Sequence, residues 1–92
     1  MNVQAEVSLY PLRTHDLGHA IGRFLGALKA AGLTVQAGNM SSTVSGDVRT
    51  VFPTIRAAFE AVAENGQVVL IMKVSNACPG GDTMEGMNTD VG

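Results

Sequence analysis

Two hydrophobic periods alternate along this chain, and their order constrains the fold more than any other feature of the sequence. Residues 3–9 alternate between apolar and polar side chains, which is the period of a strand with one covered face. Residues 17–28 and 48–62 repeat apolar side chains every three or four positions, as an amphipathic helix does. Three further strand-like runs lie at 33–37, 40–45 and 67–75.

Short polar residues and glycines mark the ends of the first helix and the turn that follows it. Asp16 or Thr14 can cap the start of this helix, and Gly32 can end it in a left-handed conformation. The two middle strands would then form a hairpin around Gly38-Asn39.

The second helix has an equally clear start and end but contains a proline. Asp47 is the expected cap, and Asn65-Gly66 is the expected stop. Pro53 removes one hydrogen bond inside the helix, so we expect either a bend there or a later start near Thr50.

The predicted order is strand, helix, strand, strand, helix, strand. Two helices can cover only one face of a four-stranded antiparallel sheet, so the order predicts an α+β, ferredoxin-like βαββαβ sandwich with strand order 4-1-3-2. We expect one domain over residues 1–83, followed by a flexible tail at 84–92, which is rich in glycine and polar residues.

The face without helices is expected to be mixed in character. Val69 and Ile71 would lie there among hydroxyl and amide side chains, which suits a contact between subunits or the floor of a small-molecule site. The residues expected on this face are Gln4, Glu6, Ser8, Tyr10, Thr34, Gln36, Ser41, Thr43, Ser45, Val69, Ile71, Lys73 and Ser75.

Length and charge narrow the possible partners. A 92-residue chain buries a modest core, so a second subunit would add stability. The near balance of six basic and eight acidic side chains, with the basic ones scattered along the chain, argues against binding to nucleic acid or to an anionic membrane. No apolar run approaches the roughly 20 residues needed to cross a bilayer, so we expect no membrane insertion. The single cysteine, Cys78, cannot form an internal disulfide, and no basic stretch followed by an apolar one opens the chain, so we expect a cytoplasmic protein.

Signals of catalysis or metal binding are weak. His15 and His19 have the spacing of a shared metal on one helix, but they fall opposite the apolar stripe and lack a third ligand. Cys78 has no base near it in the sequence. Glu6 lies on a predicted strand, where a diagonal ion pair with Lys73 is its simplest role and a cationic ligand the alternative. We therefore expect a protein that is not an enzyme and has no metal site.

Three glycines, Gly18, Gly22 and Gly26, recur at every fourth position of the first helix. Each costs the helix about 1 kcal/mol relative to alanine, so the row indicates either close approach by another backbone or chance composition.

Three stretches carry a resemblance to a known family. They are Ser-Leu-Tyr-Pro-Leu at 8–12, Ser-Ser-Thr-Val-Ser-Gly at 41–46 and Ser-Asn-Ala-Cys-Pro-Gly at 75–80. In this order on a βαββαβ chain they resemble the YkoF-like thiamine- and hydroxymethylpyrimidine-binding family, over about residues 3–83. The glycine pair at 80–81 is one glycine longer than the family pattern.

The resemblance implies a ferredoxin-like domain that binds thiamine or its pyrimidine moiety without chemical conversion, as a carrier or sensor in thiamine uptake or salvage. No cofactor is implied beyond this ligand. The YkoF type resembles two such domains in tandem, so a chain with one domain is expected to form a homodimer or a dimer of dimers. Association with a thiamine-precursor transporter would fit the same role.

The ligand needs donors and acceptors for its aminopyrimidine, and an aromatic face and a carboxylate for its cationic thiazolium. Tyr10 is the only tyrosine, and Asp82 is an alternative to Glu6 as the carboxylate. The predicted ligand-binding residues are Glu6, Ser8, Tyr10, Asn39, Ser42, Thr43, Asn76 and Cys78.

Antiparallel topology divides this set. Tyr10 would lie near Asn39, whereas Asn76 and Cys78 would emerge at the opposite end of the sheet. A site at or near a subunit interface, or a tail that folds back, would bring them together.

Two other functions compete with ligand carriage. A ferredoxin-like regulatory or assembly module could bind a protein partner or a different metabolite through the open sheet. A small acyl-phosphate hydrolase could share the fold, but residues 8–13 lack the glycine cradle that this activity needs for phosphate.

Overall fold

Six elements follow one another in the predicted order in the computed structural model of the protein, which describes residues 1–77. The expected domain end at 83 and the tail at 84–92 lie outside the described residues. The elements are β1 (Asn2–Pro11), α1 (Leu17–Ala30), β2 (Thr34–Ala37), β3 (Ser42–Asp47), α2 (Val48–Ala63) and β4 (Val68–Ser75).

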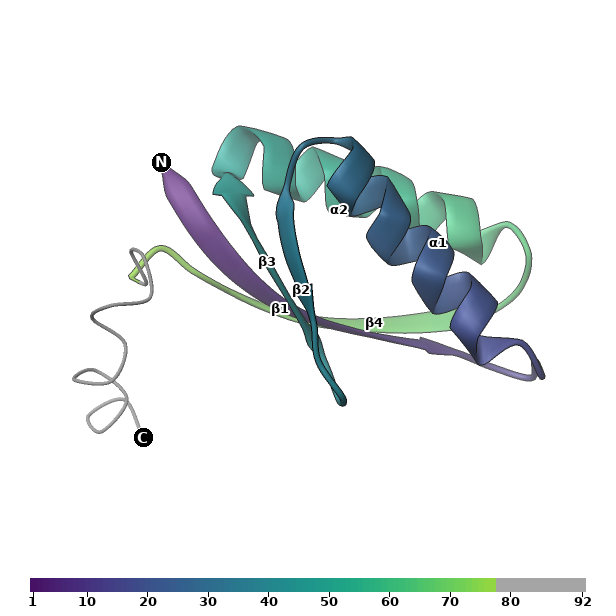
Figure 1. Ribbon diagram of the computed structural model, residues 1–92. Coiled ribbons are helices and arrows are strands. Elements are labelled where there is room, and N and C mark those ends of the chain that lie inside the picture. The colour runs from purple at the N-terminus through teal and green to yellow at the C-terminus, as the bar shows by residue number, and fades with distance from the viewer. Residues whose placement is uncertain (78–92) are drawn as a thin grey trace.

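The four strands form one sheet in the order β2-β3-β1-β4, and every neighbouring pair is antiparallel. Both helices lie on the same face of this sheet, and the other face has no covering element within residues 1–77 (Figure 1). The predicted ferredoxin-like α+β sandwich is therefore confirmed, including its strand order.

The core lies between the sheet and the two helices. Alternate residues of β1 are buried, as its two-residue period predicts. Phe24 and Leu28 from α1, and Val51 and Ile55 from α2, pack against them. Each such side chain contributes about 1.5–3 kcal/mol when it is fully removed from water. The complete core is Val3, Ala5, Val7, Leu9, Phe24, Leu28, Leu33, Val44, Val51, Ile55, Ala58 and Val62.

The predicted ends of α1 are confirmed. The Asp16 carboxylate caps the helix by accepting a hydrogen bond from the backbone N–H of His19 at 3.3 Å. The Thr14 hydroxyl accepts one from the Asp16 N–H at 3.1 Å, so both expected residues organise this end. Gly32 follows the helix with φ of +91°, a conformation that favours glycine.

The start of α2 differs from one of the two expectations. The helix begins at Val48, not near Thr50, although Pro53 lies inside it. The reason is the cap: Asp47 Oδ1 accepts a hydrogen bond from the Arg49 N–H at 2.8 Å, and Val51 and Ile55 are buried on either side of the proline. These contacts hold the first turn in place despite the missing proline N–H.

Asp47 is also held in its charged form. Hydrogen bonds from the Arg49 side chain and then from the Arg49 backbone N–H lower the pKa of the Asp47 carboxyl to about 2. The Arg49 Nε lies 3.1 Å from Asp47 Oδ1.

The β2–β3 turn is wider than predicted. Strand pairing stops at Ala37 and Ser42, so residues 38–41 form a four-residue loop instead of the expected two-residue turn. Met40, expected in the second strand of the hairpin, is in the loop and points into solvent. Ser42 and Val44 are the buried residues of β3, and the loop projects beyond the core.

No helix within residues 1–77 is long and apolar enough to span a lipid bilayer.

Two leucines of α1 provide a matched test of the core. Leu28 is fully buried and Leu17 is 49% exposed. We expect Leu28→Ala to lower the free energy of unfolding by about 2–5 kcal/mol, because it removes packed methyl groups and leaves a cavity. Leu17→Ala should change it by less than about 1 kcal/mol. Urea denaturation followed by circular dichroism measures both, and equal losses would contradict the assigned core.

Candidate functional site

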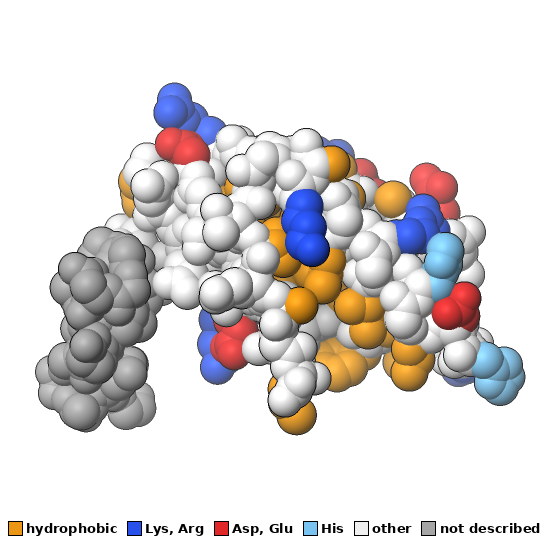
Figure 2. Space-filling model, viewed as in Figure 1, with side chains coloured by type: hydrophobic (Ala, Val, Ile, Leu, Met, Phe, Trp, Pro, Cys, Tyr) orange, Lys and Arg blue, Asp and Glu red, His pale blue; other side chains and the backbone are white. Residues whose placement is uncertain are grey.

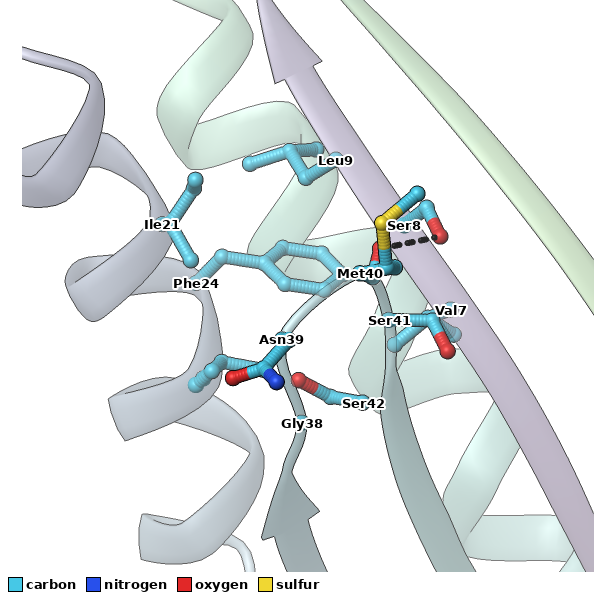
Figure 3. Close-up of a pocket in the computed structure, with 11 residues that line it drawn as sticks. Val7, Ser8, Leu9, Ile21, Phe24, Gly38, Asn39, Met40, Ser41 and Ser42 are labelled. Atoms are coloured by element: carbon cyan, nitrogen blue, oxygen red, sulfur yellow. Dashed lines mark hydrogen bonds between the residues drawn. The ribbon is translucent and has the colours of Figure 1, made fainter.

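A small cavity lies between α1, the end of β1 and the β2–β3 loop (Figure 3). Its volume is about 100 Å³, and its mouth is formed by the exposed loop. The lining residues are Val7, Ser8, Leu9, Ile21, Phe24, Leu25, Gly38, Asn39, Met40, Ser41 and Ser42.

The cavity results from strands of unequal reach. Pairing between β1 and β3 ends at Val7 and Ser42, whereas β1 continues to Pro11 beside β4. The last residues of β1 therefore have no partner on the β3 side within the described chain. The Ser8 hydroxyl donates a hydrogen bond to the Met40 carbonyl at 3.3 Å and ties the loop to β1 across this gap (Figure 3).

Polar and aromatic groups meet in this cavity. Ser42 is only 8% exposed, and its hydroxyl makes no hydrogen bond with residues 1–77. Asn39 supplies an amide with both donor and acceptor atoms from the loop. The Phe24 ring reaches from α1 toward the loop and forms an apolar wall (Figure 3). This combination suits a small flat molecule that carries ring nitrogens or an amino group.

The size of the cavity limits its occupant. A cavity of about 150 Å³ holds benzene, and sites for drug-sized ligands measure about 300–1,000 Å³. A volume of about 100 Å³ that opens at a loop can therefore receive part of one ring, and the remainder of a larger ligand must lie outside.

Beside the cavity, on the open face of the sheet, Glu6 has two polar partners. Its Oε2 accepts a hydrogen bond from the Ser41 hydroxyl at 2.8 Å, and its Oε1 lies 3.7 Å from the Lys73 ammonium. Lys73 stands directly opposite Glu6 in the β1–β4 register, not diagonally as expected. The Lys73 side chain is 82% exposed, so this ion pair contributes little to stability and leaves the carboxylate accessible to another cation.

The same face carries an apolar patch of three exposed side chains, Tyr10, Val69 and Ile71. Tyr10 stands opposite Val69, and Ile71 stands opposite Ser8. Figure 2 shows hydrophobic side chains gathered along the lower rim of the molecule, on the side away from the helices. The predicted mixture of aliphatic and hydroxyl groups is therefore present on the uncovered face.

The predicted ligand-binding residues fall into three groups. Ser8, Asn39 and Ser42 line the cavity. Glu6, Thr43 and Tyr10 lie on the adjacent open face, where Thr43 is the β3 partner of Glu6. The third group is Asn76 and Cys78, and Cys78 lies outside the described residues.

Asn76 lies at the other end of the sheet. Its amide nitrogen is 3.5 Å from the Met1 sulfur, beside the first residues of β1. About seven residues of β1 separate that end from Tyr10, which corresponds to about 23 Å along an extended strand. Asn76 and Asn39 of the same subunit therefore do not share one cavity.

The cavity is also lined by three residues that the sequence patterns did not predict as ligand-binding, namely Phe24, Met40 and Ser41. Phe24 belongs to the apolar stripe of α1, and a stripe alone does not distinguish a core residue from one that also forms a wall. Ser41 was expected on the open face, but its bond to Glu6 depends on the width of the loop, which no local pattern encodes.

The glycine row of α1 and the two histidines do not line this cavity. A β-carbon placed at Gly18, Gly22 or Gly26 would meet no atom within 4 Å in residues 1–77. No group of three or more His, Cys, Asp or Glu side chains gathers in that part of the chain at distances suited to a metal ion.

The sequence of the chain matches a known protein family. The model of the YKOF-related family matches residues 2–81. The chain belongs to the YKOF-related family. Among curated proteins, none matches its sequence.

Solved structures share the fold at low sequence identity. A protein from Thermotoga maritima, for which a role in thiamine biosynthesis or salvage has been suggested, aligns with a TM-score of 0.75 and 16% identity over 97% of this chain and 98% of that one. A hypothetical protein from Methanocaldococcus jannascii gives a TM-score of 0.77 and 22% identity over 98% and 95%. A domain of unknown function from Bacillus cereus gives 0.71 and 19% over 82% and 75%. These similarities support the fold of the YKOF-related chain.

Two glycines test whether the loop closes as described. A β-carbon at Gly38 would lie 2.5 Å from the Ser41 carbonyl oxygen, whereas one at Gly22 would meet nothing within 4 Å. Gly38→Ala should therefore destabilise the protein and disturb the loop. Gly22→Ala should stabilise it by about 0.5–1 kcal/mol through helix propensity. Thermal unfolding measures both. A stable Gly38→Ala protein would contradict the loop geometry, and a destabilised Gly22→Ala protein would indicate that another backbone packs on α1.

Proposed function

We propose that this protein binds thiamine or its hydroxymethylpyrimidine moiety without converting it, as a carrier or sensor in thiamine uptake or salvage. The observation that carries the proposal is the cavity beneath the β2–β3 loop, where an aromatic wall, an amide and a free hydroxyl converge next to an accessible carboxylate. Membership in the YKOF-related family and the role suggested for the Thermotoga maritima neighbour support the choice of ligand.

The two halves of thiamine match two parts of the site. One edge of the aminopyrimidine would enter the cavity, where Asn39 and Ser42 can pair with its nitrogens beside Phe24. The thiazolium would remain outside, over the open face. Glu6 is two residues from Ser8 on the same strand, which is about 7 Å, so its carboxylate can balance the permanent positive charge.

Binding without catalysis agrees with the chemistry of the lining. None of the described residues that line the cavity is His, Cys, Asp, Glu, Lys or Arg. General acid–base catalysis on a ring inside the cavity would need such a group among the lining residues, and the nearby Glu6 carboxylate lies on the open face, where it is paired with Ser41 and Lys73.

We further propose that the open face is covered by a second copy of the chain, in a homodimer or a dimer of dimers. Tyr10, Val69 and Ile71 offer the apolar centre of an interface. Glu6 and Lys73 lie beside this centre. A two-fold axis through the face can therefore bring the Glu6 carboxylate of one subunit close to the Lys73 ammonium of the other. The thiazolium would then lie between subunits.

Two asparagines at opposite ends of the sheet test the site. Asn39→Ala removes an amide from the cavity, whereas Asn76→Ala removes one near Met1. In calorimetric titration with thiamine, we expect Asn39→Ala to weaken binding about tenfold, because a lost hydrogen bond leaves a ring nitrogen unpaired. Asn76→Ala should bind within about twofold of the wild type, because Asn76 lies at the other end of the sheet.

Hydroxymethylpyrimidine in the same titration identifies the half of the ligand that is recognised. If the wild-type protein bound neither thiamine nor hydroxymethylpyrimidine, the proposal would be contradicted. A regulatory or assembly module that uses the open face would then be favoured. Equal loss in the two variants would contradict the position of the site.

A further inference from the structure

A second cavity of about 120 Å³ lies on the other flank of α1, where β1 ends, α1 begins and α2 ends. Ala20 and Arg23 of α1 face this cavity, whereas Ile21, Phe24 and Leu25 face the first one. The corner is closed by a backbone hydrogen bond from the Leu12 N–H to the Gln67 carbonyl at 2.9 Å. The two cavities are therefore separate and share no lining residue.

Donor groups surround the second cavity. Arg23 and His19 line it from α1, and Asn65 and Gln67 line it from the segment after α2. The side chains of Arg23, His19 and Asn65 make no hydrogen bond or ion pair with residues 1–77. Figure 2 shows histidine, basic and acidic side chains close together at the right end of the molecule, where α1 begins.

The Gln67 amide is oriented by a neighbouring cation. Arg13 Nη1 donates a hydrogen bond to Gln67 Oε1 at 2.8 Å, so the amide nitrogen of Gln67 is left to donate elsewhere. Arg13 itself has φ of +57°, the only positive φ of a non-glycine residue within 1–77. A second guanidinium is thereby held at the rim of the cavity.

One acidic side chain lines the cavity, and it is already engaged. Asp16 accepts the His19 N–H at the start of α1. Arg23 lines the cavity and Arg13 is hydrogen-bonded to the lining residue Gln67, so two guanidinium groups stand against this single carboxylate. The local balance of charge and of free donors therefore favours an anion.

We propose that this second cavity binds a small oxyanion of the size of inorganic phosphate. Its volume of about 120 Å³ suits a compact ion, and any larger group attached to that ion would have to lie outside the cavity. Arg23 would contribute charge-assisted hydrogen bonds, and the amides of Asn65 and Gln67 would fix the orientation of the ion. The anion would bind independently of any ligand in the first cavity.

The test uses inorganic phosphate as the probe at constant ionic strength, because nonspecific attraction is screened by salt. Titration calorimetry compares the wild type with Arg23→Gln and with Lys29→Gln, which removes a cation from α1 outside both cavities. We expect Arg23→Gln to weaken phosphate binding by about tenfold or more, as loss of a charge-assisted hydrogen bond does. Lys29→Gln should change the affinity by less than about twofold.

A second readout locates the ion. In nitrogen–proton correlation spectra, phosphate should shift the signals of Asn65, Gln67 and His19, and leave those of Asn39 and Ser42 unchanged. Acetate tests for a site that prefers carboxylates, and methyl phosphate tests for a site that prefers phosphate monoesters. If either compound bound more tightly than inorganic phosphate, the proposed specificity would be overturned. No heat and no shift at about 10 mM phosphate, or equal weakening in both variants, would overturn the site itself.

Discussion

Everything in this structure depends on a mismatch between layers: a four-stranded sheet has two faces, and two helices cover one of them. Alternate residues of β1 enter the core, and the residues between them necessarily face outward. One strand thus supplies Val7 and Leu9 to the core and Glu6, Ser8 and Tyr10 to the open face. The hydrophobic effect stabilises the first set and leaves the second available for binding.

A second mismatch, in strand length, creates the candidate site. β1 and β4 pair up to Pro11 and Val68, but β3 begins opposite Val7. The β2–β3 loop must therefore cross open space beside the end of β1, and the Ser8–Met40 hydrogen bond holds it there. α1 passes over the same end and separates this cavity from the one near Arg23. Each flank of one helix thus offers a distinct chemical environment.

Local sequence patterns were sufficient to predict the helices and strands, but not how these elements pack and pair with one another. Apolar side chains at every second position of residues 3–9 predicted a strand with one open face. Apolar side chains at every third or fourth position of residues 17–28 predicted a helix with one buried face. The start of α2 was less predictable, because Val51 and Ile55 hold Pro53 in place only through tertiary packing. The direct pairing of Glu6 with Lys73 likewise depends on a register that no single strand specifies. The role of Phe24 as a cavity wall was unpredictable for the same reason, because it depends on where the β2–β3 loop lies relative to α1.

The central claim is that the open face is half of an interface, and molecular mass in solution tests it most directly. Sedimentation equilibrium at micromolar concentration should give a dimer or tetramer for the wild type. Ile71→Lys, at the centre of the apolar patch, should give monomers, whereas Phe52→Lys, which alters an equally exposed apolar residue on α2, should leave the mass unchanged. A monomeric wild type, or an Ile71→Lys protein with unchanged mass, would contradict the account.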